Sequence, residues 1–428
     1  MLTALVIIFF LAYAAIALEH PLKINKSASA LLAAGLLWTI YALNSSDTTL
    51  VVENLRESVS ATAQIIFFLM GAMTIVEVVD AHNGFYTITS RIRTTKLSTL
   101  LWLVCSVTFF LSAILDNLTT TIVMISLVKK LLDRHDDRLF FAGMIVIAAN
   151  AGGAFSPIGD VTTTMLWIGG QITSLNIIKG VALPSLICLI IPLIITSYSM
   201  RGRKVVPPTF VERRAGFETT PFEQNFMFFM GMATLISVPI FKAVTHLPPF
   251  MGILFGLGIL WLVGELIHRK KPEDDFKQHL SLVSALSRID MSCIVFFIGI
   301  LLAVATLEHS HILSSLAAWL TKTIGREDII VTLIGLASAV VDNVPLVAAS
   351  MGMYPLAAYP TDSFLWEFMA YCAGTGGSIL IIGSAAGVAA MGLEKIHFFW
   401  YARRIGLLAA VGYFGGIAAY IAQYRLFH

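Results

Sequence analysis

Long apolar segments alternate with short polar or charged loops along the whole chain. Many of them approach the ~20 residues that a helix needs to cross a bilayer. The pattern predicts an all-α polytopic membrane protein. In chain order the segments lie near residues 1–18, 28–43, 59–79, 97–133, 138–170 and 177–200, and then near 224–245, 247–267, 290–307, 328–359, 363–393 and 397–424.

The order of the segments predicts a duplication, with a polar, basic linker at 201–222 between two sets of six. We expect a first repeat at 1–200 and a second at 223–428. Within them we expect scaffold helices at 1–80 and 224–307, hairpins at 97–133 and 328–359, broken helices at 138–170 and 363–393, and single helices at 177–200 and 397–424. We therefore expect about 10 transmembrane helices plus two re-entrant hairpins, an arrangement typical of inverted-repeat ion transporters.

Composition agrees with a membrane protein and narrows its function. The chain is 57% hydrophobic and 13% charged, whereas soluble domains carry about 25% charged residues. The net charge of +2 comes from basic residues in short loops, which is typical of membrane topology and does not indicate nucleic-acid binding. The sequence contains no Walker A motif, nucleophile–base pair or metal cluster, so we expect neither ATP use, nor a cofactor, nor an enzyme.

Short motifs repeat between the two halves. Ser112-Ala-Ile-Leu-Asp116-Asn117 recurs in pattern as Ser338-Ala-Val-Val-Asp342-Asn343, 226 residues later. About thirty residues after each copy comes a glycine-rich break, with Gly152 and Gly153 in the first half and Gly376 and Gly377 in the second. The matching positions predict an ion site built by an internal repeat.

Basic loops set the expected orientation. Lys23 and Lys26 follow the first segment, and Arg91, Arg93 and Lys96 follow the third, which puts both loops in the cytoplasm. The segment 97–133 has basic residues at both ends, so it enters and returns as a hairpin; two full crossings are the alternative. The second half then runs inverted. We expect both termini on the extracytoplasmic side of a plasma (bacterial inner) membrane.

The segment 138–170 is too long for a straight membrane helix. If it were helical throughout, it would exceed the ~30 Å hydrocarbon core. Pro157 and the glycines around it interrupt the helix between Asn150 and Asp160. Such a break exposes backbone carbonyls and helix ends at mid-membrane, where transporters build cation sites.

Three carboxylates are the main candidates for ion binding: Asp116, Asp342 and Asp160. Placing an Asp at the centre of a membrane helix costs roughly 2.5–3.5 kcal/mol, so a repeated pair indicates a function. A carboxylate in a low-dielectric site can hold a proton near neutral pH or bind Na⁺ when deprotonated. The alternative for each is a helix N-cap.

Neutral oxygen atoms would complete a cation site. The candidate ligands are Asn117, Asn343, Asn150, Thr162, Thr163, Ser112, Ser338 and Ser378. Glu77 is a candidate for a proton path, and an interfacial position is its alternative. Neither hairpin tip nor either break contains Lys or Arg, which argues against an anionic substrate.

These motifs resemble the NhaD family of sodium/proton antiporters, within the ion transporter superfamily. The resemblance covers essentially the whole chain. It rests on Leu115-Asp116-Asn117-Leu-Thr-Thr-Thr, Asn150-Ala-Gly-Gly-Ala-Phe-Ser-Pro-Ile-Gly-Asp160-Val-Thr-Thr, Asp342-Asn343-Val-Pro345 and Gly374-Thr-Gly-Gly-Ser378. Dicarboxylate carriers of the superfamily typically have Ser-Asn-Thr at the hairpin tips, where this chain has Asp-Asn.

The resemblance implies that Na⁺, with Li⁺ as a further candidate, leaves the cytoplasm in exchange for protons. It also implies a homodimer in which hairpins and broken helices move against a scaffold in an elevator-type displacement. It transfers ion-site roles to ten polar residues of this chain: Asp116, Asn117, Asn150, Asp160, Thr162, Thr163, Asp342, Asn343, Ser112 and Ser338. The hypothesis is therefore an Na⁺/H⁺ antiporter, and the alternatives are a Na⁺-coupled symporter of a small organic anion or a passive cation channel.

Overall fold

The computed structural model describes residues 2–45, 47–89, 94–205, 219–269 and 275–427. Within these ranges the regular structure is helical, with one isolated bridge between Lys96 and Lys204. Seven of the described helices are long and apolar enough to cross a bilayer. The prediction of an all-α polytopic membrane protein is confirmed. The predictions for Arg91 and Arg93, and for most of the 201–222 linker, lie outside the described residues.

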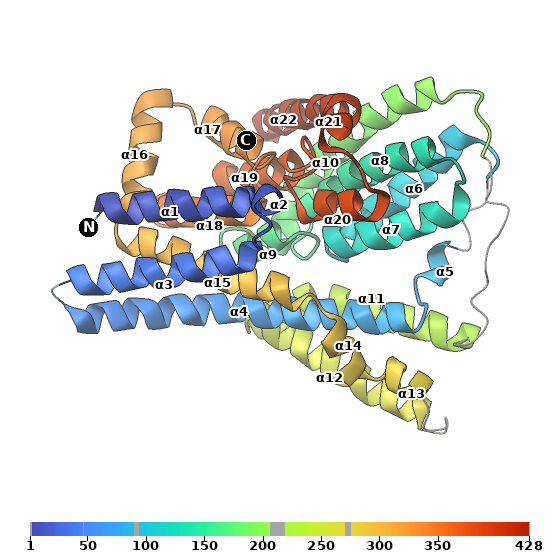
Figure 1. The fold of residues 1–428 in the computed structure, drawn as a ribbon, viewed down its shortest axis with the longest axis horizontal. Coiled ribbons are helices and arrows are strands. Elements are labelled where there is room, and N and C mark those ends of the chain that lie inside the picture. The colour runs from blue at the N-terminus through green and yellow to red at the C-terminus, as the bar shows by residue number, and fades with distance from the viewer. Residues whose placement is uncertain (1, 46, 90–93, 206–218, 270–274, 428) are drawn as a thin grey trace.

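The first half contains α1 (Leu2–Ala17), α2 (Glu19–Leu22), α3 (Lys26–Asn44), α4 (Thr48–Ala81), α5 (Tyr86–Thr89), α6 (Leu97–Ser112), α7 (Asn117–Leu131), α8 (His135–Ala154), α9 (Val161–Ile168) and α10 (Ser174–Ser199). α1 and α4 begin and α3 ends at one end of the molecule, and α10 ends toward the other (Figure 1).

The second half contains α11 (Pro221–Thr245), α12 (Pro249–His268), α13 (Asp275–Leu280), α14 (Leu282–Arg288), α15 (Met291–His309), α16 (Ile312–Ile324), α17 (Glu327–Ala337), α18 (Asn343–Met353), α19 (Phe364–Gly376), α20 (Ala385–Glu394), α21 (Phe398–Tyr401), η1 (Ala402–Gly406) and α22 (Leu407–Phe427). The hydropathy pattern predicts no helix where α16 lies, between the segments at 290–307 and 328–359. This helix is only 13 residues long and buries few of its side chains, among them Leu313 and Ala317.

Each predicted hairpin consists of two short helices. The chain turns between α6 and α7 just before Asn117, and between α17 and α18 just before Asn343. With 16 residues, α6 is about 24 Å long, which is shorter than a ~30 Å hydrocarbon core. This length suits a segment that enters the bilayer and returns, although the number of crossings stays a prediction.

Both predicted breaks occur, but the first lies later in the chain than its glycines suggest. Gly152 and Gly153 belong to α8, which continues to Ala154, and the break covers residues 155–160. In the second half, α19 includes Gly376 and ends before Gly377. The glycines mark close packing. A methyl group at Gly152 would overlap the Phe109 carbonyl oxygen, and one at Gly376 would overlap that of Gly335.

Contacts recur between the halves at matching positions. The Ser112 hydroxyl donates to the Ala149 carbonyl at 2.7 Å, and the Ser338 hydroxyl donates to that of Ala373 at 3.0 Å. Each bond fastens a hairpin to the broken helix beside it.

The scaffold shows the same matching. A Cβ at Gly71 of α4 would meet the Ile253 side chain of α12 at 2.9 Å, and one at Gly299 of α15 would meet Ala30 of α3 at 2.6 Å. An inverted repeat would produce these paired contacts.

We expect Gly152→Ala to lower the melting temperature of the detergent-solubilised protein, because its methyl group would push against the backbone of α6. Overpacking of this kind costs about 1–3 kcal/mol. Gly35→Ala is the matched control, since nothing lies within 4 Å of its added methyl group and alanine favours a helix by about 1 kcal/mol. Equal melting temperatures for the two variants would contradict the packing role of Gly152.

Candidate functional site

The two hairpin tips and the first break meet at one cavity of about 70 Å³. A water molecule needs roughly 10–15 Å³ measured in this way, so the cavity has room for a hydrated ion. Its lining includes all three predicted carboxylates, Asp116, Asp160 and Asp342, together with Asn117, Asn343 and Lys26.

Asp160 is the most enclosed of the three carboxylates, with 2% of its surface exposed. It caps the start of α9, and its Oδ1 accepts from the backbone N–H and the hydroxyl of Thr162, both at 3.0 Å. Its Oδ2 accepts from the amide of Asn117 at 3.1 Å and from that of Asn343 at 3.4 Å. One carboxylate therefore connects a broken helix to both hairpins.

Asn150 of α8 joins the two halves on the other side of Asn117. Its Oδ1 accepts from Asn117 Nδ2 at 3.0 Å, and its Nδ2 donates to the hydroxyls of Ser378 and Ser384, each at 2.9 Å. Asn150 is fully buried. An amide suits this position because it can both donate and accept hydrogen bonds, and because it adds no charge beside the Asp160 carboxylate.

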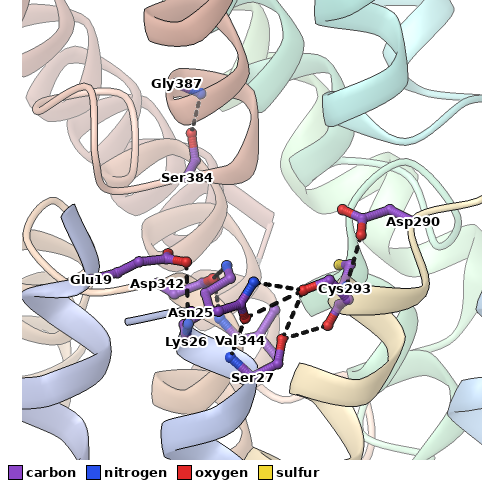
Figure 2. Close-up of polar contacts among 11 residues, drawn as sticks. Glu19, Asn25, Lys26, Ser27, Asp290, Cys293, Asp342, Val344, Ser384 and Gly387 are labelled. Carbon is purple, nitrogen blue, oxygen red and sulfur yellow. Dashed lines mark hydrogen bonds and ion pairs between the residues drawn. The ribbon is translucent and has the colours of Figure 1, made fainter. Parts of the chain in front are cut away.

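Asp116 and Asp342 hold equivalent places but have different partners. Asp116 caps α7 and accepts from the backbone N–H and the hydroxyl of Thr119, at 2.8 and 2.6 Å. Asp342 caps α18 through a longer bond of 3.4 Å from the Val344 N–H, and its Oδ2 lies 3.0 Å from Nζ of Lys26 (Figure 2). Both are therefore helix caps, and both also line the cavity.

Lys26 is the residue at this site that sequence reasoning missed. The loop pattern places it in a cytoplasmic loop, but the structure makes it the first residue of α3, with its ammonium group in the cavity. The hairpin tips and the breaks contain no Lys or Arg, but α3 places this lysine in the cavity. The available signal was Asn25, an N-cap residue that starts α3 before Lys26 rather than after it.

Four other predicted residues have partners outside the cavity. Ser112 and Ser338 donate to backbone carbonyls and fasten the hairpins, and Thr163 donates to the Asp160 carbonyl at 2.9 Å. Glu77 accepts from Arg288 at 3.2 Å and does not belong to the cavity lining. These contacts fasten neighbouring segments to one another, and the predicted roles of the four residues in ion binding or proton transfer stay predictions.

The arrangement offers oxygen atoms of several kinds within one space. Hard cations such as Na⁺ prefer carboxylate, amide and hydroxyl oxygens. In this structure the amide nitrogens of Asn117 and Asn343 face Asp160. If each amide rotated by half a turn, its oxygen would face the same space. Asn117 Nδ2 also donates to Asn150 Oδ1, so a rotation of the Asn117 amide requires the Asn150 amide to rotate with it.

Comparisons with known proteins give a consistent result. A family model described as "citrate transporter" matches residues 13–374. "Sodium/proton antiporter 1" of Arabidopsis thaliana is 49% identical over 99% of this chain and 73% of its own length, and "Sodium/proton antiporter 2" of the same plant is 44% identical over 98% and 99%. "Na(+)/H(+) antiporter NhaD" of Vibrio cholerae is 31% identical over 91% and 84%.

These relatives span nearly the whole chain and carry the names of transporters, not enzymes. The matched region includes the hairpins, the first break and the cavity they form. This chain also matches the citrate-transporter family model over most of its length. It therefore belongs to the NhaD-type family of sodium/proton antiporters.

Proposed function

We propose that this protein is a secondary active Na⁺/H⁺ antiporter that exports Na⁺ from the cytoplasm in exchange for protons. The observation that carries the proposal is the convergence of Asp116, Asp160 and Asp342 on one cavity. The names of the relatives support the choice of ions. Li⁺, which has the same charge and is smaller, is a second candidate for the exported ion.

In the proposed mechanism, Na⁺ and protons compete for the same carboxylates. Asp160 binds Na⁺ directly, because the described partners of its Oδ2 are two amides that can rotate. Asn117, Asn343 and the carbonyls of the break at 155–160 supply neutral ligands. Thr162 holds the carboxylate of Asp160 in place. Protonation of the carboxylate removes the charge that attracts Na⁺, so only one ion is carried at a time.

The two halves act as inverted repeats in this proposal. The matched contacts at Gly152 and Gly376, and at Gly71 and Gly299, support it. Hairpins and broken helices, tied by Ser112 and Ser338, would move as one body against α3, α4, α12 and α15 in an elevator-type displacement. We also propose a homodimer in a plasma membrane, the bacterial inner membrane, with both termini on the extracytoplasmic side.

A Na⁺-coupled symporter of a small organic anion is the second candidate. Two observations favour it: Lys26 places a positive charge in the cavity, and the matching family model is described as a citrate transporter. However, Asp342 already neutralises this lysine. In proteoliposomes, a symporter would move Na⁺ only after a carboxylate such as citrate is added, whereas an antiporter needs none.

We expect Asp160→Asn to reduce Na⁺-driven proton movement at least about tenfold, because hydrogen bonds and ligand contacts to a charged group contribute about 1.5–3 kcal/mol. The measurement is the collapse of a pH gradient in proteoliposomes after Na⁺ is added, compared with K⁺. Asp328→Asn is the matched control. Asp328 pairs with Arg326 at 2.5 Å at the outer end of a hairpin. Full exchange by Asp160→Asn, or equal loss in both variants, would contradict the role of Asp160.

Competition also predicts how Na⁺ affinity depends on pH. If one proton excludes one Na⁺, the apparent KM for Na⁺ rises about tenfold for each pH unit below the titration of the competing carboxylate, and it levels off above. The maximal rate at saturating Na⁺ should change much less. Initial rates over a range of Na⁺ concentrations at several pH values test this. A KM that stays constant while the maximal rate falls would place the proton outside the Na⁺ site.

A further inference from the structure

Lys26 reaches the cavity from the scaffold and contacts the tip of the second hairpin. Its Nζ lies 3.0 Å from Asp342 Oδ2 and 4.4 Å from the centroid of the Phe296 ring of α15. About a quarter of the Lys26 side chain and a sixth of the Asp342 side chain are exposed. The ammonium therefore occupies the position beside Asp342 where a free cation would bind.

A difference between the repeats explains why Asp342 accepts a lysine. In the first half, Thr119 gives Asp116 two hydrogen bonds. The equivalent position, again 226 residues later, is Pro345, which has neither an N–H group nor a hydroxyl. Among the described residues, Asp342 accepts one backbone hydrogen bond, of 3.4 Å, from Val344 to its Oδ1. Its Oδ2 is left to a cation, and Lys26 supplies one.

The lysine itself is held in place by a set of bonds that Figure 2 shows. Its backbone N–H donates to Glu19 Oε1 at 3.1 Å, and Asn25 accepts from the Ser27 N–H at 2.8 Å. The Ser27 hydroxyl donates to the Ser292 carbonyl at 2.7 Å. These contacts fix the first turn of α3 to the start of α15, so the ammonium is attached to a rigid part of the scaffold.

We propose that the Lys26 ammonium is a tethered cation that competes with Na⁺ for Asp342, an inference that rests on the proposed Na⁺/H⁺ exchange. When Lys26 is in place, two carboxylates of the described cavity lining, Asp116 and Asp160, have no paired cation. Na⁺ that reaches Asp342 displaces Lys26. Because Lys26 belongs to the scaffold and Asp342 to a hairpin tip, this displacement also breaks a contact between the two bodies, which links ion binding to movement.

The first test is equilibrium binding of radioactive ²²Na⁺ to purified protein at fixed pH and ionic strength. We expect Lys26→Gln to bind Na⁺ about tenfold more tightly, a factor that corresponds to 1.4 kcal/mol. Lys26→Arg keeps the positive charge, so its affinity for Na⁺ should stay close to that of the unchanged protein. In an Asp342→Asn background, Lys26→Gln should have no effect, because the competitor has lost its target.

Lys129→Gln is the matched control, since Lys129 binds the Leu393 carbonyl at 2.6 Å outside the cavity. The proposal is overturned if the Kd of Lys26→Gln for Na⁺ stays within about twofold of that of the unchanged protein. It is also overturned if Lys26→Gln changes the Na⁺ affinity equally in the Asp342 and the Asp342→Asn backgrounds. If the unchanged protein showed no Na⁺/H⁺ exchange, the proposed function would be overturned instead.

A second test needs no substitution and so does not depend on the folding of a variant. Na⁺ should increase the rate at which an amine-reactive reagent modifies Lys26, as measured by mass spectrometry, because displacement frees the ammonium from Asp342. Choline at equal ionic strength should not. A rate that Na⁺ leaves unchanged or lowers would overturn the proposal.

Discussion

The buried carboxylate of Asp160 is the interaction on which the rest of the site depends. A charge removed from water is costly unless donors replace its hydration. Here the donors come from three elements: Thr162 of α9 and the two hairpin asparagines, Asn117 and Asn343. No single helix could supply them from these directions. The need to satisfy Asp160 therefore brings together tips and helix ends that are far apart in sequence.

Close backbone packing makes this convergence possible. Gly152 lies against the Phe109 backbone, and Gly159 faces the Ser112 carbonyl and the Ala113 backbone. Side chains at these positions would separate the hairpin from the break. Gly376 and Gly383 play the same part beside Gly335 and Ala339. The glycines thus bring short polar groups such as Asn117 within hydrogen-bonding distance of Asp160.

The sequence predicted much of this because its signals are local. Helical segments follow from the length of apolar runs, and the breaks follow from Pro157 and the glycines. The repeated Asp-Asn pairs marked the tips, and all three carboxylates lie on the cavity. What could not be predicted depends on contacts between distant segments. Lys26 is predicted to lie in a loop, because its contact with Asp342 depends on how α3 packs against the second hairpin. The hydrogen bond from Ser112 to Ala149 likewise depends on how α6 packs against α8.

The differences between the repeats give the site its asymmetry. Asp160 has Ser384 as its counterpart, a residue that caps α20 and accepts from Asn150. Thr119 corresponds to Pro345, and α3 starts with Lys26 whereas α12, its counterpart in the scaffold, starts with Pro249. The first half thus supplies a buried carboxylate and a hairpin Asp satisfied by neutral groups, whereas the hairpin Asp of the second half is paired with a lysine. Because Lys26 neutralises Asp342 in this structure, the two carboxylates of the described cavity lining that have no paired cation, Asp116 and Asp160, both belong to the first half. A backbone that repeats can therefore place its unpaired carboxylates in one half only.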